Sequence, residues 1–425
     1  MKVIDRLAPL ATAGMSLGLD AMRDALAHYG NPQRSIPCVH VAGTNGKGSV
    51  VAMVDAVLRA GGMRVGRYTS PHLHRFVERI AVDGEDADEA RLLPIVDEVL
   101  RAREDGDIPP LSFFEVATLA AWMYFRDAGV EAAVIEVGLG GRLDATTVCA
   151  PVVTAITRIA LDHTALLGDS LAKVAREKAG ILKPGVKCVL GPSLSPSGER
   201  EAYAAIRSVA EAVGAPLQLA PVVSTEPNGA VRVPWTGGAV TLHPTLVGAH
   251  QVENLAVVTG VCAHLARMAW PVDAKALDEG VGSTRWPCRL ERVADDLIVD
   301  GAHNEDGVDA LMAALPTVLR GRRLGAVIYG ASRDKPWASM GARVCALVPR
   351  ERRFFTAAAL PRAVSGAELA AVIGGVDAGA PLEALSRARG ALGDGEVALA
   401  FGSLYAVAAV RAAALGIESD PPVGL

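Results

Sequence analysis

A strand, a glycine-rich turn and a helix follow one another near the N-terminus, and this unit constrains the fold more than any other feature of the chain. The apolar run Cys38–Ala42 is typical of a buried strand. The turn Gly43-Thr44-Asn45-Gly46-Lys47-Gly48-Ser49 comes next, and residues 50–60 predict a helix that ends at two glycines. Further short apolar runs alternate with helical patterns along the chain. We therefore expect an α/β protein with parallel sheets.

Composition supports this fold class and limits the partners. Hydrophobic residues make up 51% of the 425 residues and aromatic residues only 4%, a mixture that favours helices packed on a parallel sheet. The chain is too long for one ordinary core, so two domains are expected. The net charge is −5, without a long block of one sign, which gives no indication of nucleic-acid binding.

The remaining bulk features indicate a cytoplasmic protein. The six cysteines are scattered without the spacing of a metal site or a redox motif, so we expect reduced and mostly buried thiols. No signal peptide is expected, because the N-terminus lacks a charged region followed by an apolar region and a cleavage site. No transmembrane helix is expected, because the apolar runs are short and interrupted by glycine, proline or charge. A monomer is the expected state.

Two series of strands and helices are expected, separated at Trp286 and Pro287, where a helical pattern is interrupted. Residues 1–286 would form a P-loop-type parallel sheet domain with helices on both faces, and residues 287–425 a smaller Rossmann-like α/β domain. Residues 217–243 predict an antiparallel excursion, and the tail after Ile417 is expected to be loosely ordered. The expected strands cover residues 133–137, 152–156, 187–190, 297–299, 324–329, 353–356 and 397–401, and the expected helices residues 19–29, 199–213, 251–268 and 307–319.

The glycine-rich turn has the chemistry of a phosphate site. Backbone N–H groups at a helix N-terminus attract anions, and glycines let the backbone approach them closely. Lys47 would reach the β- and γ-phosphates of a nucleotide, and the Ser49 hydroxyl suits Mg²⁺. The turn departs from the common pattern because Gly48 separates the lysine from the serine. Glycines alone would leave a plain connector as an equal alternative, but the whole pattern favours phosphate binding by Asn45, Gly46, Lys47, Gly48 and Ser49.

Residues 40–49 resemble the signature of folylpolyglutamate synthases and dihydrofolate synthases, which are amide-forming enzymes of the Mur-ligase superfamily. The order Lys47-Gly48-Ser49 favours this branch, because the muramyl ligases typically place Thr or Ser directly after the lysine. The resemblance continues in order along nearly the whole chain, which makes coincidence implausible. The further matching segments are residues 68–73, 78–80, 113–115, 136–146, 161–164, 176–181, 248–251 with Asn254, 286–290, 300–304 and 402–405.

The resemblance implies ATP as a substrate and two magnesium sites. Mg²⁺ would neutralise the phosphates and prefers oxygen ligands. Glu136 follows a strand, at the edge where α/β sheets bind ligands, so we interpret it as a metal ligand and not as a solvated strand end. The resemblance adds Ser70 and His163 to Ser49, although imidazole is a less natural ligand of Mg²⁺, and a structural histidine is the alternative.

Lys178 would be misplaced as a cation near bound metal. The resemblance implies that this lysine is carbamylated, which would turn it into a carboxylate-like anion. An ordinary surface lysine is the alternative. Together with Lys47 and His163, Lys178 is a candidate for the catalytic machinery.

The second domain should complete the nucleotide site. By resemblance, Arg289, Asp300 and Asn254 contact the nucleotide, and His303 lies beside them. A tight turn after a strand is the alternative for Asp300. The sequence departs from the family pattern at Cys288, where Gly or Ala is usual, and at Thr147, where Asn is common, and the effect of both departures stays open.

The pterin side of the site has weaker indications. The ring of Phe114 could stack on a flat heterocycle, but Phe113 and Phe114 could equally be core residues. The candidates for substrate binding are Ser16, Leu17, Gly18, Leu19, Ser112, Phe113, Phe114 and Leu143.

These features predict an ATP-dependent carboxylate–amine ligase. It would add L-glutamate to dihydropteroate through an acyl phosphate, and whether it also extends reduced folates stays open. Its partners would be the small molecules ATP, dihydropteroate or folate, and L-glutamate, without nucleic acid or membrane. The alternatives are another Mur-superfamily ligase with a different acid, a P-loop kinase with a hydroxyl acceptor, and a nucleotide-binding protein without catalysis.

Overall fold

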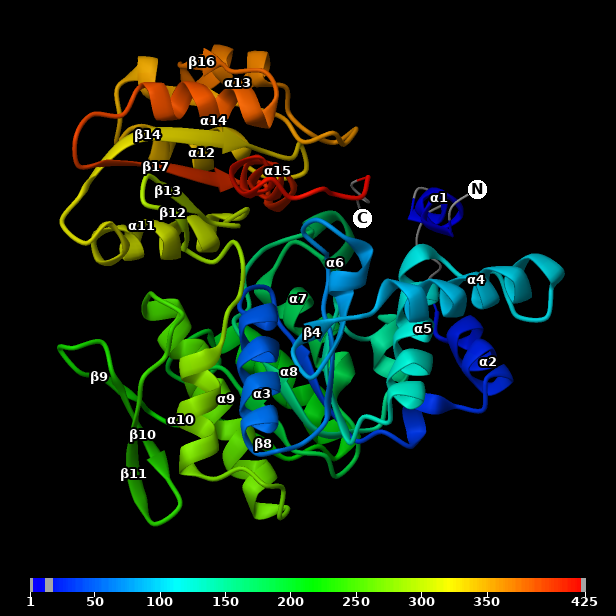
Figure 1. Ribbon diagram of the computed structural model, residues 1–425. Helices are drawn as coiled ribbons and strands as arrows, with labels where there is room; N and C mark the ends of the chain where they lie inside the picture. The colour runs from blue at the N-terminus through cyan, green and yellow to red at the C-terminus, as the bar shows by residue number, and fades with distance from the viewer. Residues whose placement is uncertain (1–2, 12–17, 422–425) are drawn as a thin grey trace.

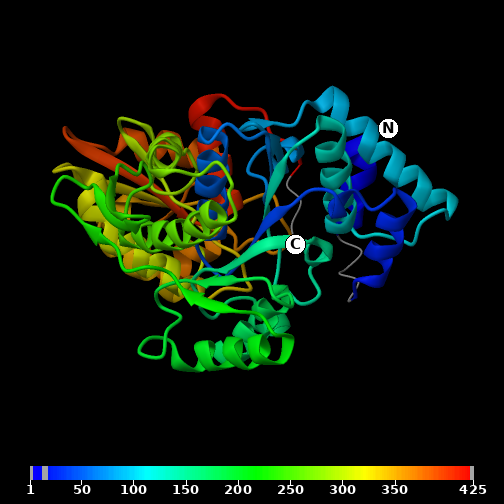
Figure 2. The same cartoon turned by 90° about the horizontal axis from the view of Figure 1, so that it is seen from below.

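The computed structural model describes residues 3–11 and 18–421. These residues form an eight-stranded, a three-stranded and a six-stranded sheet. Figure 1 shows the six-stranded sheet and its helices stacked over one end of the eight-stranded part. In Figure 2 the helices near the N-terminus (blue and cyan) lie on the opposite side from the six-stranded sheet (yellow to red). The expected α/β class with two sheet units is confirmed.

The eight-stranded sheet has the strand of the glycine-rich unit near its centre. Its strand order is β4-β3-β2-β5-β1-β6-β7-β8. Strands β2, β5, β1, β6, β7 and β8 run parallel to one another, and β3 and β4 pair antiparallel at one edge. All five residues of β1 are buried, as a strand covered on both faces requires. The bounds are β1 (Cys38–Ala42), β2 (Val65–Tyr68), β3 (Ile80–Val82), β4 (Glu85–Asp86), β5 (Ala132–Glu136), β6 (Pro151–Ile156), β7 (Cys188–Leu190) and β8 (Leu217–Leu219).

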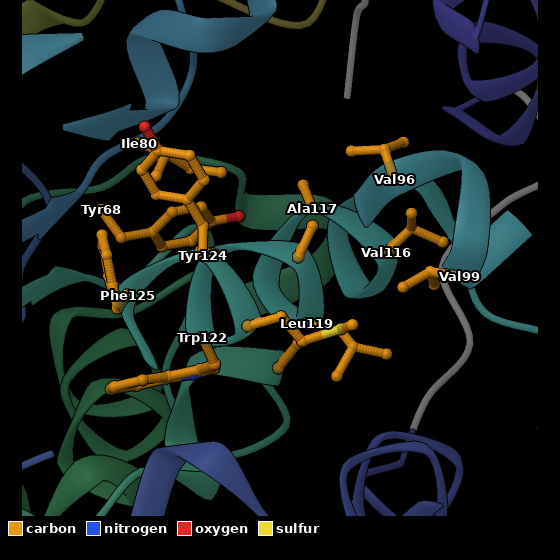
Figure 3. Close-up of a cluster of buried hydrophobic side chains, with 14 of the residues drawn as sticks. Tyr68, Ile80, Val96, Val99, Val116, Ala117, Leu119, Trp122, Tyr124 and Phe125 are labelled. Carbon is orange, nitrogen blue, oxygen red and sulfur yellow. The ribbon is translucent and has the colours of Figure 1, made fainter. Parts of the chain in front are cut away.

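Helices cover both faces of this sheet, because successive side chains of a strand point to opposite faces. Val39 and Val41 pack in one cluster with α3 (Lys47–Ala60), α9 (Ala249–Arg267) and α10 (Ala274–Ser283). Cys38 packs in the cluster of the other face with α5 (Phe113–Ala128). Figure 3 shows part of this second cluster, including Trp122 and Phe125, whose ring centroids are 6.0 Å apart.

Shorter helices complete the first unit. Helices α7 and α8 pack over the ends of β6 and β7. None of the described helices combines the length and the apolar character needed to cross a bilayer. The bounds are α1 (Val3–Leu7), α2 (Asp20–His28), α4 (Glu89–Asp105), α6 (Thr164–Leu167), α7 (Leu171–Lys178), α8 (Arg200–Val213) and the 3-10 helices η1 (Ala8–Ala11), η2 (Pro32–Arg34), η3 (Phe76–Arg79), η4 (Ala145–Val148) and η5 (Ala179–Ile181).

The antiparallel excursion is smaller than expected. Strands β9 (Ser224–Thr225), β10 (Val231–Trp235) and β11 (Gly238–Leu242) do form an antiparallel sheet. Residues 217–219, however, form β8, which pairs in parallel with β7 at the edge of the large sheet. The prediction was wrong for these residues because they follow α8, and a strand after a crossover helix joins the parallel sheet.

The six-stranded sheet has the order β12-β13-β17-β14-β15-β16 and is parallel except for β12. Val327 packs with α11, α12 and α13 on one face, and Ile328 packs with α14 and α15 on the other. The bounds are β12 (Glu291–Ala294), β13 (Leu297–Val299), β14 (Arg323–Gly330), β15 (Arg353–Phe355), β16 (Val376–Asp377), β17 (Glu396–Gly402), α11 (Glu305–Leu319), α12 (Trp337–Cys345), α13 (Gly366–Ile373), α14 (Pro381–Gly390), α15 (Leu404–Leu415) and η6 (Arg350–Arg352).

The described part of the tail is held in place, which corrects the expectation of a loose end. The backbone N–H of Asp420 donates to the carbonyl of His74 (2.7 Å), and Phe76 N–H donates to the Asp420 carboxylate (2.7 Å). Arg411 of α15 also lies 3.0 Å from the His74 ring nitrogen Nε2. The tail therefore ties the second unit to the segment after β2.

The chain passes from the first unit to the second between α10, which ends at Ser283, and β12, which begins at Glu291. Trp286 and Pro287 lie in this connection. A domain boundary at residues 286/287 is our proposal.

Candidate active site

A cavity of about 410 Å³ lies between the two large sheets. It opens at the carboxyl ends of β1, β5 and β6, the edge where parallel sheets bind ligands. The structure brings every expected nucleotide, metal and catalytic candidate to this cavity. The candidates that line it are Asn45, Gly46, Lys47, Gly48, Ser49, Ser70, Glu136, His163, Lys178, Asn254, Arg289, Asp300 and His303.

The glycine-rich loop presents an uncapped helix N-terminus to this cavity. Helix α3 begins at Lys47, three residues before the expected start, and Gly46 at its N-cap has a positive φ of 91°. No side chain caps the helix, so the first N–H groups are free for an anion. Gly46 cannot be replaced easily, since an added Cβ would lie 2.2 Å from Asn254 Oδ1. The loop is thus shaped to bind a phosphate.

Lys47 and Glu136 face each other across this loop. The ammonium of Lys47 donates to the Thr44 carbonyl (3.3 Å) and lies 4.0 Å from Glu136 Oε1. Glu136 is 5% exposed, and the backbone N–H of Ser70 donates to its Oε2 (3.2 Å). Burial raises the pKa of this carboxyl group, against the opposing effect of the Lys47 charge. A cation and a buried carboxylate therefore meet where a terminal phosphate would lie.

Two amide side chains form a hydrogen-bonded chain that ends at the Ser49 hydroxyl. The Gln251 Nε2 donates to Ser49 Oγ (3.2 Å), and the Asn254 Nδ2 donates to Gln251 Oε1 (2.9 Å). All three side chains are buried. Asn254 therefore lies directly beneath the loop, next to Gly46. Sequence reasoning missed the role of Gln251, although its spacing of three residues from Asn254 on a helix was a usable signal.

Asp162 and His163 follow β6 at the mouth of the cavity. His163 has a left-handed backbone (φ 47°), and burial lowers the pKa of its imidazole to about 4, so the ring is neutral at pH 7. Burial alone would raise the pKa of Asp162, but His303 and Lys335 hold it well below its usual range. Lys335 forms an ion pair with Asp162, and His303 Nε2 is 3.6 Å from Asp162 Oδ2.

Polar contacts join the two units across the cavity. The Asn304 Nδ2 donates to Asn45 Oδ1 (3.0 Å) and to Asp162 Oδ2 (3.0 Å). The Asn45 Nδ2 donates in turn to Asp306 Oδ2 (2.7 Å). Together with the Lys335 ion pair, these contacts connect the two units on the side of the phosphate loop. Sequence reasoning missed Asp162, Asn304, Asp306 and Lys335 because their partners lie more than a hundred residues away.

Lys178 is buried at the end of α7 and is not a surface lysine. Its ammonium donates to the carbonyl of Gly43 in the phosphate loop (2.8 Å). Burial lowers the pKa of Lys178 to about 7, and the nearby Lys47 contributes to this shift. The side chain therefore loses its proton far more readily than an exposed lysine does.

The second unit contributes a turn that positions Arg289. The Asp300 carboxylate is buried and accepts from the backbone N–H groups of Leu290 (2.8 Å) and Ala302 (2.9 Å). Cys288 has a positive φ of 56°, the left-handed region that favours glycine, and its carbonyl accepts from Gly301 N–H (2.8 Å). The departure at Cys288 is thus accommodated with backbone strain. Asp300 acts here as the anchor of the turn as well as part of the cavity wall.

The departure at Thr147 is also accommodated locally. Its buried hydroxyl donates to the carbonyl of Gly141, in the turn that follows Glu136. The threonine therefore helps to hold the segment that leads from β5 to η4.

The expected pterin-side residues do not line this cavity within the described residues. Ser112 caps α5 by accepting from Glu115 N–H (3.4 Å), and Phe113 is a core residue at 3% exposure. Phe114 packs against Gly138, which does line the cavity, and against Tyr68. Gly18, Leu19 and Leu143 lie apart from the cavity lining, and Ser16 and Leu17 fall outside the described residues.

The expected metal ligands do not form a ready-made cage. Among the described residues, no group of three or more His, Cys, Asp or Glu side chains is placed to hold a metal ion. Ser49, Ser70, Glu136 and His163 line the same cavity, with two hydroxyls, one carboxylate and one neutral imidazole. Such a sparse set fits an ion that shares its ligands with a nucleotide and water, as Mg²⁺ does.

Known proteins match this chain along most of its length. The folylpolyglutamate synthase of Lacticaseibacillus casei is 34% identical over 412 residues, which cover 92% of each chain. The dihydrofolate synthase/folylpolyglutamate synthase of Escherichia coli is 33% identical over 76% of this chain and 73% of that protein. This chain belongs to the folylpolyglutamate synthase/dihydrofolate synthase family. It is thus an ATP-dependent ligase, as the loop and its resemblance predicted.

A solved structure shares the whole fold of this chain, and a longer relative matches it over part of its own length. The structure of E. coli FolC in complex with DHPP and ADP has a TM-score of 0.81 and 29% identity, with 96% of both chains covered. The chain is also 35% identical to a probable bifunctional folylpolyglutamate synthase/dihydropteroate synthase of Haloferax volcanii, but it spans 48% of that protein's length. No family model matches the chain.

Proposed function

We propose that this chain joins L-glutamate to dihydropteroate, using ATP to convert the pteroate carboxylate into an acyl phosphate. The observation that carries the proposal is the position of Lys47, at the uncapped N-terminus of α3 and 4.0 Å from a buried carboxylate, inside a cavity closed by a second sheet. The related E. coli enzyme binds ADP in the same fold, which supports the choice of nucleotide. Extension of reduced folates is a second reaction that the same cavity would serve.

The residues of the loop would hold the ATP phosphates during phosphoryl transfer. The free N–H groups of α3 and the ammonium of Lys47 would take up the charge that develops as the γ-phosphoryl moves to the carboxylate. Arg289 and His303 would contact the nucleotide from the other side of the cavity, beside the turn anchored by Asp300. The glutamate amine then attacks the acyl carbon, the amide bond forms, and phosphate leaves.

Closure of the cavity would protect the acyl phosphate from water. Asn45, Asp162 and Lys335 already bridge the two units, so the cleft has a polar seam on the side of the loop. Exclusion of water matters because an acyl phosphate hydrolyses readily. The seam therefore favours transfer to the amine over loss to solvent.

Mg²⁺ fits the oxygen-rich lining, and we propose two ions held by Ser49, Ser70, Glu136 and His163 together with the phosphates. Bound there, the ions would neutralise phosphate charge and polarise the transferred group. The neutral state of the His163 ring leaves a lone pair available for this role. The buried position of Glu136 likewise suits a carboxylate that gains a cation on binding.

We propose that Lys178 is carbamylated, by attack of its neutral amine on CO₂ to give a carbamate and a proton. Its pKa of about 7 and its burial beside Gly43 support this, because the reaction needs an unprotonated amine. With carbon-13 bicarbonate, we expect one carbamate resonance that is full above pH 8 and lost below pH 6. The signal should be absent in Lys178→Met. An unmodified lysine at saturating bicarbonate would contradict the proposal.

Substrate choice separates the proposed function from its rivals. Purified protein with ATP, Mg²⁺ and glutamate should release ADP with dihydropteroate and not with a UDP-sugar acid. Release with tetrahydrofolate as well would show the second, chain-extending activity. ATP turnover that does not depend on an amino acid would favour a kinase, and no turnover with either pterin substrate would overturn the proposal.

Phe114, which packs next to Gly138 at the cavity wall, is our preferred contact for the pterin ring. Gly18, Leu19, Ser112, Phe113 and Leu143 would then shape the surroundings of that ring. A monomer is the proposed state of the enzyme.

A further inference from the structure

The connection between the two units places an indole ring against the phosphate loop. An ideal Cβ added to Gly48 would lie 2.8 Å from Trp286 Nε1, 2.9 Å from Cζ2 and 3.0 Å from Cε2. Gly48 belongs to the first turn of α3, between Lys47 and Ser49. The close approach of this ring is a physical reason for the glycine that interrupts the usual lysine–serine pair.

An ion pair with a buried carboxylate also lies beside the indole. The guanidinium carbon of Arg67 lies 5.4 Å from the centroid of the Trp286 ring. Arg67 Nη1 donates to Asp55 Oδ2 (3.3 Å), and Asp55 is a fully buried residue of α3. The indole therefore contacts both the start of α3 and a cation that is itself attached to α3.

The chain on either side of Trp286 is anchored to a different unit. Before it, Thr284 is held against α10 by a hydrogen bond to the Gly280 carbonyl (2.8 Å). After it, Cys288 N–H donates to Glu291 Oε2 (2.9 Å), and its carbonyl accepts from Gly301 of the second unit. The indole therefore lies on the connection between the two units and beside the first turn of α3.

We propose that Trp286 is a positioning residue that couples closure of the cleft to the geometry of the phosphate loop. When the second unit closes, the indole presses on Gly48 and fixes the N–H groups of Lys47 to Ser49 for the phosphates. When the loop is filled by a nucleotide, the indole is fixed in turn, so the closed cleft is favoured. This inference rests on the proposed binding of ATP at the loop.

The mutual contact of Gly48 and Trp286 provides the sharpest test. Gly48→Ala should raise the KM for ATP about tenfold or more, because its methyl group collides with the indole. Trp286→Phe replaces the indole by a smaller ring, which leaves more room for that methyl group, and alone should raise the KM for ATP severalfold, with little effect on the KM for glutamate. The double variant should bind ATP better than Gly48→Ala. Strictly additive losses would overturn the proposal.

Fluorescence adds a readout that a merely structural tryptophan would not give. The full-length protein is titrated with the ATP analogue AMPPCP, in parallel with calorimetry. We expect a change of emission that disappears in Trp286→Phe, whose indole lies beside Gly48, and persists in Trp270→Phe, a matched control that packs against the hydrophobic cluster of α9 and α10. Normal binding with an unchanged signal in Trp286→Phe would contradict the coupling, whereas absence of binding to the native chain would instead contradict the proposed function.

Discussion

Replacing Lys47 by alanine is expected to lower kcat/KM for ATP by about 10³-fold, since preorganised charge at a phosphoryl-transfer site contributes on this scale. The reason is its position at the first turn of α3, directed into the cavity beside Glu136. The fold should survive the change, because the hydrogen bond of its ammonium is a long one to the Thr44 carbonyl (3.3 Å). Steady-state kinetics with varied ATP and thermal unfolding would measure the two effects.

A surface lysine serves as the matched control for this prediction. Lys275 lies in α10 with a side chain that is 78% exposed, in an exposed pair with Glu279, and Lys275→Ala should leave activity unchanged. If Lys47→Ala retained more than a tenth of the native kcat/KM with an intact fold, the loop would not be the site of phosphoryl transfer.

Replacing Glu136 by glutamine is expected to lower kcat by about 10²-fold and to raise the Mg²⁺ requirement about 10- to 100-fold, the range seen when support of a metal site is lost. The carboxylate is 5% exposed, and its pKa is raised by burial. A raised pKa means that folding disfavours the charged form at pH 7, so neutral glutamine removes an unfavourable burial. The variant should therefore be at least as stable as the native protein while it loses activity.

The pH dependence of stability tests whether burial of the charged Glu136 carboxylate costs stability. An acid whose pKa is raised in the folded state costs stability above that pKa, and the cost disappears at low pH, where both states are protonated. The stability advantage of Glu136→Gln should thus shrink as the pH falls towards 4. Glu201→Gln, on the exposed side of α8, should change neither stability nor Mg²⁺ dependence. Loss of stability in Glu136→Gln without a shift in Mg²⁺ dependence would mean a structural role.

Local patterns in the sequence predicted the elements that carry the site. The run Cys38–Ala42 has the bounds of β1, because a short run that is apolar except for His40 and precedes a glycine turn has few alternatives. The predicted start of α3 was three residues late. Lys47, Gly48 and Ser49 resemble loop residues in the sequence, but in the structure they form the uncapped first turn of the helix. Residues 217–219 were misplaced because strand pairing depends on what lies beside a strand.

Contacts between distant segments could not be predicted in the same way. Asp162 and Lys335 are 173 residues apart, and neither has a local pattern that indicates an ion pair across a cleft. The contact of Trp286 with Gly48 is of the same kind: the glycine was noticed as a departure, but its cause lies in another part of the chain. Phe113 shows the opposite case, where an aromatic residue in a family-like segment is a core residue.

The fate of a carboxylate oxygen tests the central claim, that the loop activates a carboxylate by phosphoryl transfer. Dihydropteroate labelled with oxygen-18 in its carboxylate is incubated with the enzyme, ATP, Mg²⁺ and glutamate, and the released phosphate is analysed by mass spectrometry. An acyl phosphate passes one labelled oxygen to phosphate for each amide formed, so we expect labelled phosphate in equal amount to the product. Unlabelled phosphate, with amide formed at the same rate, would contradict the account.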